Sequence, residues 1–288
     1  MIFKSNFPKL DIPNIDIPQF CIREGKRRSS QSSKRCGFAI RDGPTGKSMD
    51  IYQLETASIK LASGFAHKLN IQPNQVVSIF SPNTIYYPVV VYGTLMLGGI
   101  VTLTNPTYTP REFAHQLKDS NSVAIATQSH LLKVTLEAIR LSGLNIPMQN
   151  IFLLDIHPVN NSPYSHIEDL YLDKPVKICR IGTEEEASKK VAVIQYSSGT
   201  TGLAKGVLLT HKNILSSMIM NSCFAVYDEW FDRSKYPPKF IGVLPFYHSY
   251  GFGSVLNLGI SMVFCLSLFL SLIELKLLNF SIRLSSCA

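Results

Sequence analysis

Amphipathic helical patterns alternate with short apolar runs along the chain from residue 51 onward. The segment 52–69 carries five apolar residues at helical spacing: Leu54, Ala57, Leu61, Phe65 and Leu69. It leads into VVSIF, and the same unit then recurs, with 84–97 before IVTL, 111–120 before VAIAT and 130–141 before IFLLD. Runs that are apolar throughout are typical of strands buried on both faces of a parallel sheet. The alternation therefore predicts an α/β fold of layered, parallel-type sheets with flanking helices.

After IFLLD the pattern weakens and then resumes. Residues 156–189 are rich in Pro, Asn, Ser and charged residues, which predicts a surface excursion. VAVIQY at 191–196 predicts another strand, 211–226 a helix and FIGVLP at 240–245 a further strand.

The positive charge of the chain is local. The 288 residues are 45% hydrophobic and 17% charged, as expected of a globular protein, and the formal net charge is +8. Residues 1–48 hold ten Lys or Arg against four Asp or Glu, which accounts for most of that excess. The basic cluster at 23–35 lacks interleaved aromatic residues, so we expect a solvated loop and no nucleic-acid partner. A nuclear signal, a nucleic-acid arm or a kinase-accessible stretch is the alternative.

The cysteines predict a reducing compartment. None of the six forms a C-x-x-C pair, and the N-terminus lacks the pattern of a signal peptide. We therefore expect free thiols and a cytoplasmic location, and we assign no metal ligands.

The segment YSSGTTGLAKGV, Tyr196 to Val207, follows an apolar run and concentrates glycines and hydroxyl side chains around one lysine. Glycines permit positive φ and close backbone approach, so a strand, this turn and a following helix would form a nest of N–H groups for an anion. Lys205 adds a point charge suited to the outer phosphates of a nucleotide. A plain hairpin turn is the alternative.

Two common nucleotide motifs are absent. Ala204 occupies the place of the glycine that precedes the lysine in G-x-x-x-x-G-K-[ST], and TGKS at 45–48 lacks the first glycine of that motif because Arg41 stands there. No G-x-G-x-x-G follows a predicted strand. The loop therefore does not predict an ordinary P-loop NTPase or a dinucleotide-binding domain.

The longer string YSSGTTGLAKGVLLTHKN resembles the AMP-binding signature of the adenylate-forming superfamily. That superfamily includes acyl-CoA synthetases, firefly-type luciferases and peptide-synthetase adenylation domains. Residues 81–120 resemble the early part of plant 4-coumarate:CoA ligases, and LPFYHSYGF at 244–252 resembles their second active-site segment. The resemblance covers about 35–263 and departs at Ala204, where the family usually has proline, which predicts a slightly looser loop.

The resemblance implies roles for named positions. It places the ATP β- and γ-phosphates at Ser197, Ser198, Gly199, Thr200, Thr201, Gly202 and Lys205, and the acyl-adenylate at His248, Tyr250 and Ser254. We assign His248 to substrate positioning and no residue to proton transfer, because an ionised carboxylate needs no general base; an ordinary structural histidine is the alternative.

The resemblance also implies a reaction. A carboxylic acid would attack the α-phosphorus of ATP, release pyrophosphate, and pass from AMP to the thiol of coenzyme A, with Mg²⁺ as a further cofactor. The acyl substrate stays open among hydroxycinnamates, fatty acids and jasmonate-precursor acids.

The C-terminal part departs from the family. We expect a basic extension at 1–34, the N-terminal part of an AMP-binding large domain at 35–263, and an apolar tail without evident fold at 264–288, with the small C-terminal domain absent. Residues 250–273 hold no charged residue, so a tail-anchored membrane protein is one alternative and a non-catalytic nucleotide-binding fragment is another. We expect the 288-residue chain itself to be inactive, and a peroxisomal location only for a full-length form.

Overall fold

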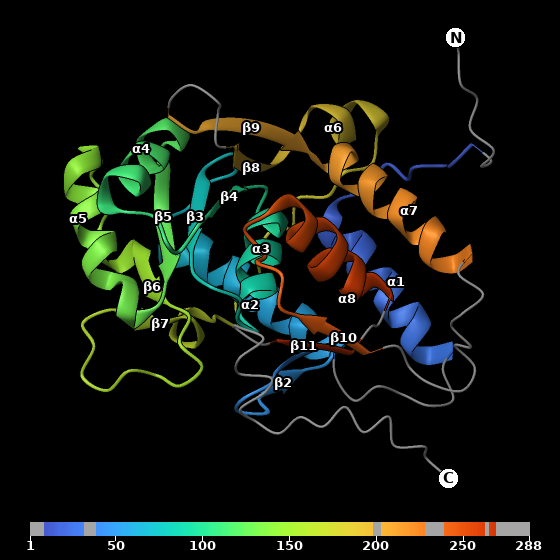
Figure 1. Ribbon diagram of the computed structural model, residues 1–288, viewed down its shortest axis with the longest axis horizontal. Helices are drawn as coiled ribbons and strands as arrows, with labels where there is room; N and C mark the ends of the chain where they lie inside the picture. The colour runs from blue at the N-terminus through green and yellow to red at the C-terminus, as the bar shows by residue number, and fades with distance from the viewer. Residues whose placement is uncertain (1–8, 32–38, 198–202, 228–238, 263–264, 269–288) are drawn as a thin grey trace.

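The computed structural model of the chain describes residues 9–31, 39–197, 203–227, 239–262 and 265–268. They form a seven-stranded sheet, a four-stranded sheet and the helices around them (Figure 1). The larger sheet has the order β7-β6-β5-β3-β4-β8-β9, and its neighbours are parallel except β8 with β9. Its strands are β3 (Val76–Phe80), β4 (Ile100–Thr104), β5 (Ser122–Thr127), β6 (Ile151–Leu153), β7 (Ser165–His166), β8 (Val191–Ser197) and β9 (Lys205–Thr210). The predicted α/β fold is confirmed.

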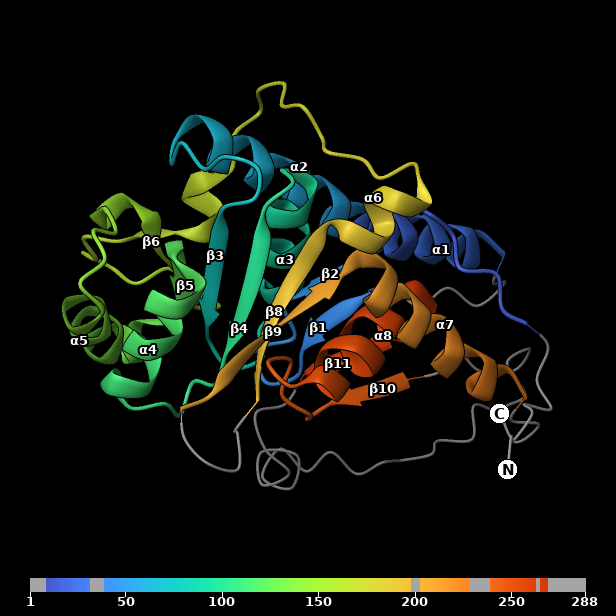
Figure 2. The same cartoon turned by 90° about the horizontal axis from the view of Figure 1, so that it is seen from above.

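Four helices cover the two faces of this sheet. They are α2 (Ile51–His67) and α3 (Tyr87–Met96) on one face, and α4 (Pro110–Ser120) and α5 (Leu132–Ser142) on the other (Figure 2). Strand β3 alternates between them: Val77 and Ile79 pack in the same hydrophobic cluster as α2 and α3, whereas Phe80 packs with α4 and α5. Both faces are buried, which explains why the strand sequences are apolar throughout.

Side-chain caps set the starts of α2 and α4. The Asp50 carboxylate accepts a hydrogen bond from the Gln53 backbone N–H (2.7 Å), and the Gln53 side chain accepts one from the Asp50 N–H (2.9 Å). Thr109 and Glu112 form the same reciprocal pair at the start of α4. Because Pro110 fills the first turn of α4, where a free N–H is not needed, this helix begins just before the predicted residue 111.

The smaller sheet joins distant parts of the chain. Its order is β10-β11-β1-β2, with β1 (Ile40–Asp42), β2 (Ser48–Met49), β10 (Lys239–Gly242) and β11 (Cys265–Leu268). Strand β11 is parallel to both β1 and β10, and its Leu266 and Leu268 are buried. The expectation of a tail without fold is therefore wrong for residues 265–268, because alternate leucines there fill the core of this sheet.

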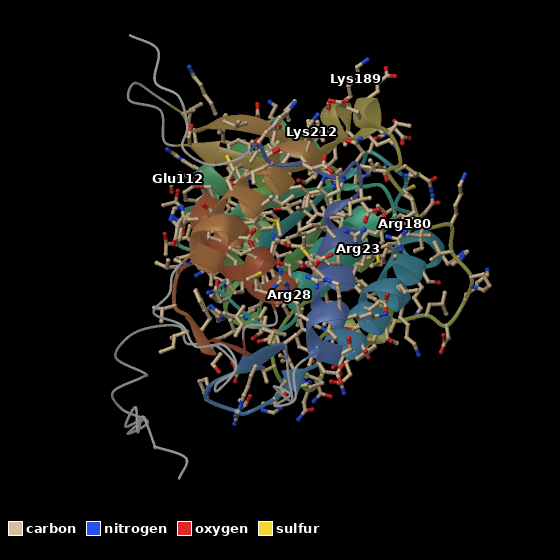
Figure 3. All side chains as sticks on the ribbon, turned by 90° about the vertical axis from the view of Figure 1, so that its right-hand side faces the viewer. Arg23, Arg28, Glu112, Arg180, Lys189 and Lys212 are labelled. Carbon is tan, nitrogen blue, oxygen red and sulfur yellow. The ribbon has the colours of Figure 1, made fainter. Side chains whose placement is uncertain are left out.

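The solvated loop expected at 23–35 is also wrong over its described part. Residues up to 31 belong to α1 (Ile17–Gln31), which packs Ile17, Cys21 and Ile22 into the core. Charged residues occupy its outer side, where Arg27 pairs with Glu24 (2.8 Å), and Figure 3 shows Arg23 and Arg28 along this face of the molecule. The many basic residues of this segment obscured the apolar residues that recur at helical spacing within it.

The remaining elements are short, apart from α7. They comprise α6 (Glu184–Lys189), α7 (His211–Tyr227), α8 (Leu258–Met262), a π-helix η4 (Gly251–Asn257), and the 3₁₀ turns η1 (Ser129–Leu131), η2 (Met148–Asn150) and η3 (Ile167–Leu170). In the described part of the chain, no helix has the length and apolar character that crossing a membrane requires. Most of the segment 263–273 lies outside the described residues.

Candidate functional site

The predicted phosphate segment forms the end of a hairpin. Strand β8 lies parallel to β4, and β9 returns antiparallel beside β8, with Ser197 opposite Lys205 at the loop end of the hairpin. Ser198, Gly199, Thr200, Thr201 and Gly202 lie outside the described residues. The expected order of strand, loop and helix is corrected, because α7 begins only at His211, after β9. The β-branched and leucine residues after Lys205 pair with β8 instead of starting a helix.

Lys205 is available to a ligand. It and Ser197 are both exposed, at the edge of the sheet where the parallel strands β3, β4 and β8 reach their carboxyl ends. In the described ranges no ion pair or hydrogen bond from the Lys205 side chain is found. Open α/β sheets bind ligands at this edge, so an unpaired ammonium and a hydroxyl here form a donor set suited to phosphate.

Gly206 follows Lys205 and makes a close contact. A Cβ at this position would lie 3.1 Å from side-chain atoms of both Ile194 and Tyr196, and 3.2 Å from the Asp119 carboxylate of α4. A larger residue would push the hairpin away from α4. Packing at the third glycine of the signature is thus tight enough that any larger residue requires its neighbours to shift.

The second predicted segment leads into the π-helix. His248 is exposed and its ring centroid lies 4.3 Å from that of Tyr247, while Tyr250 is 64% exposed and directly precedes η4. Ser254, on η4, accepts a hydrogen bond from the Asn221 side chain of α7 (2.9 Å). His248 and Tyr250 therefore face solvent, as groups that contact a ligand must, and the Ser254 hydroxyl is held by a neighbouring helix.

Gly251 allows the sharp turn at the start of η4. A Cβ on Gly251 would lie 1.9 Å from the carbonyl oxygen of Pro245, far inside van der Waals contact. The His248 carbonyl accepts a hydrogen bond from the Phe252 N–H (2.8 Å), which closes the turn. Only glycine leaves room for this path, so Gly251 is a residue of the site that sequence reasoning passed over.

Asn83 is a second residue that sequence reasoning missed. Its amide nitrogen donates to the carbonyl oxygens of Gly242 (3.1 Å) and Leu244 (2.9 Å), and its oxygen accepts from the Phe246 N–H (2.8 Å). It lies three residues after the end of β3 and fixes the backbone that leads to His248. The signal was present as SPN after a buried strand, since a carboxamide at a strand end commonly bonds to backbone.

Two tyrosines lie in the two parts of the chain near the site: Tyr108 between β4 and α4, and Tyr247 in the second predicted segment. Burial, then the charge of Glu112, then the neighbouring Tyr247 raise the pKa of Tyr108 above its ordinary value. Burial also raises the pKa of Tyr247. Tyr108 and Tyr247 are thus neutral neighbours at physiological pH. No hydrogen bond joins Lys205 to His248 or Tyr250 in the described ranges, so the two predicted segments contribute separate parts of the site.

Comparison with known proteins identifies the family. The family model described as AMP-binding enzyme matches residues 31–268. The chain belongs to the AMP-binding enzyme family. This AMP-binding chain is 32% identical over 257 residues to 4-coumarate--CoA ligase 3 of Arabidopsis thaliana, with 88% of the chain and 42% of the relative covered. It is 30% identical over 243 residues to a long-chain-fatty-acid--CoA ligase of Bacillus subtilis, with 76% and 41% covered.

A solved structure agrees with the fold. The luciferase-like enzyme from the nonluminescent mealworm Zophobas morio superimposes with a TM-score of 0.74 at 19% identity, covering 94% of the AMP-binding chain and 58% of that protein. The chain spans less than half the length of the two ligases above, since it covers 42% of one and 41% of the other. The predicted family is confirmed, whereas the assignments of the individual site residues stay predictions.

Proposed function

We propose that the chain carries the phosphate-binding part of an ATP-dependent carboxylic acid:CoA ligase that acts through an acyl-adenylate. The observation that carries the proposal is the exposed Lys205, which has no side-chain partner among the described residues and lies opposite Ser197 at the carboxyl edge of the sheet. The identity to two CoA ligases supports the same reaction class.

The donor set fits the leaving group of adenylation. When a carboxylate attacks the α-phosphorus, negative charge develops on the departing pyrophosphate. The Lys205 ammonium and the Ser197 hydroxyl would hold those oxygens, together with the backbone and hydroxyls proposed at 198–202. MgATP would supply the adenylyl group when bound, with pyrophosphate as the leaving group, and we propose no protein ligand for the metal ion.

The acyl group would lie against the second segment. His248 and Tyr250 present an aromatic, exposed surface, and Ser254 offers a hydroxyl oriented by Asn221. We propose that these side chains position the carboxylic acid and take no proton from it. A hydroxycinnamate of the 4-coumarate class is the first acid to test, with a long-chain fatty acid as the alternative. For the location of the protein in the cell we propose the cytoplasm.

Pyrophosphate and ATP binding test the proposal on the 288-residue chain. We expect calorimetric titration to detect binding of both in the presence of Mg²⁺, and Lys205→Ala to weaken it by roughly tenfold, since charged hydrogen bonds contribute on the order of 1.5–3 kcal/mol. Lys189→Ala, at an exposed lysine of α6, is the matched control and should bind as the unaltered chain does. Absence of binding, or equal binding by the Lys205→Ala variant, would overturn the phosphate assignment.

Product analysis separates the ligase from a nucleotide-binding fragment. The chain is incubated with MgATP, coenzyme A and either 4-coumarate or a fatty acid, and AMP and acyl-CoA are measured. We expect binding without turnover, because adenylation needs nucleotide, metal and carboxylate to be oriented together. Turnover above the Lys205→Ala variant would contradict the expected inactivity and would identify the acid.

A further inference from the structure

Helix α4 contacts the hairpin immediately after its loop. The Nε2 atom of His115 lies 2.9 Å from the carbonyl oxygen of Ala204. A carbonyl oxygen only accepts hydrogen bonds, so Nε2 must carry the proton in this contact, whether the ring is neutral or charged. His115 thus holds the residue that directly precedes Lys205.

The same helix contacts the hairpin immediately before its loop. The Tyr196 hydroxyl donates to the Asp119 carboxylate at 2.5 Å, and a Cβ added at Gly206 would lie 3.1 Å from the Tyr196 ring and 3.2 Å from that carboxylate. Burial, then the hydrogen bond to Asp119, raise the pKa of Tyr196 well above its ordinary value, so its hydroxyl keeps its proton throughout the physiological range. Asp119 thus contacts β8 directly and lies close to Gly206 of β9, at the loop end of the hairpin.

The spacing explains how one helix reaches both strands. His115 and Asp119 are four residues apart, so they lie one turn apart on one side of α4. Together they contact Tyr196 before the loop and Ala204 after it, and Asp119 lies close to Gly206 on the other side of Lys205. Figure 1 shows α4 beside the start of β9, which follows the loop.

Neither side chain is needed to hold α4 in the fold. The helix is anchored from its other side by Phe113, Ala114 and Leu117, which are buried in the cluster shared with α5. Asp119 is exposed and His115 only half-buried. The contacts of His115 and Asp119 add little to the core, and they reach residues before and after the loop. Their main effect is therefore on the hairpin.

We propose that His115 and Asp119 are positioning residues that set the direction in which Lys205 and Ser197 present their donors to a phosphate ligand. The proposal rests on the phosphate-binding function proposed above. If the donors are already oriented before the ligand binds, fewer side chains have to be ordered on binding, and the loss of conformational entropy is smaller. Ala204 makes the contact more important, because alanine does not restrict φ as the proline usual in the family would.

Variants of α4 and β8 in the 288-residue chain test this, with inorganic pyrophosphate as the probe in calorimetric titrations. His115→Phe keeps an aromatic ring without a donor, whereas His115→Gln keeps an N–H that can reach the carbonyl. We expect His115→Phe, Asp119→Ala and Tyr196→Phe each to weaken pyrophosphate binding by roughly fivefold, the size of one lost hydrogen bond. His115→Gln should restore affinity to within about twofold of the unaltered chain.

Two further measurements separate positioning from general stability. The Asp119→Ala, Tyr196→Phe double variant should bind no more weakly than either single variant, since both remove one contact. Lys118→Ala, at an exposed neighbour on α4, should leave affinity unchanged. Thermal midpoints of the ligand-free variants should stay close to that of the unaltered chain.

The outcomes distinguish the two proposals. If the unaltered chain binds pyrophosphate through Lys205 but His115→Phe and Asp119→Ala bind equally well, the positioning role is wrong and the phosphate assignment stands. If His115→Gln is as weak as His115→Phe, the hydrogen bond to Ala204 is not the cause and the proposal also fails. If the unaltered chain binds no pyrophosphate, both proposals fail together.

Discussion

Lowering the pH should destabilise the chain through one buried histidine. His211 is only 5% exposed at the start of α7, and its Nδ1 atom accepts a hydrogen bond from the Ile17 N–H of α1 (3.2 Å). Burial, and secondarily the positive charge of Lys190, lower the pKa of His211 from 6.5 to about 4. Protonation would remove the acceptor that Ile17 needs and place a charge in the core.

The sign of the effect follows from the lowered pKa. The unfolded chain binds the proton near pH 6.5 and the folded chain only near pH 4, so this contribution to stability is complete above 6.5 and is lost toward 4. The two pKa values give a loss of about 1 kcal/mol between pH 7.5 and 5.5 and about 3 kcal/mol at pH 4.

A titration-free variant isolates this contribution. His211→Asn retains an acceptor oxygen close to the position of Nδ1 and does not titrate. Urea unfolding followed by circular dichroism gives the free energy of unfolding of both chains at pH 7.5 and 5.5. We expect the unaltered chain to lose about 1 kcal/mol more than His211→Asn, because carboxylates titrate equally in both. Equal losses in the two chains would refute a depressed His211 pKa as the cause.

Three further substitutions test the contacts that hold the backbone around the second segment, with the free energy of unfolding measured by chemical denaturation. Gly251→Ala should cost roughly 3 kcal/mol or more or prevent folding, since its Cβ would overlap a backbone carbonyl 1.9 Å away; a cost below about 1 kcal/mol would contradict this turn. Asn83→Leu should cost about 2–4 kcal/mol, because three backbone groups of the 242–246 segment lose their partner, and a neutral effect would count against that role. Tyr92→Phe removes a 3.0 Å hydrogen bond to the buried Asn257 of η4 and should cost about 1–2 kcal/mol, with no change expected if that bond is absent in solution.

Local patterns were sufficient for the central layers. VVSIF at 76–80 coincides with β3, and the apolar spacing over 52–69 marks α2 to within two residues at either end. Such elements are dictated by periodicity, because a strand buried on both faces has to be apolar and an amphipathic helix has to repeat its apolar residues every three or four positions. The signature at 196–213, with the segments 81–120 and 244–252, likewise sufficed to predict the family.

Long-range pairing was decided only by the tertiary structure. Nothing local shows that Lys205 starts a strand opposite Ser197, that Leu266 packs between β1 and β10, or that Asn83 bonds to backbone about 160 residues later. The basic residues around Arg27 masked the helix α1 for the same reason, since its stability comes from the surface it packs against. Sequence by itself thus determined the repeating α/β units and the family, whereas the path of the hairpin and its contacts with α4 depended on which distant backbone groups and side chains were left to pair.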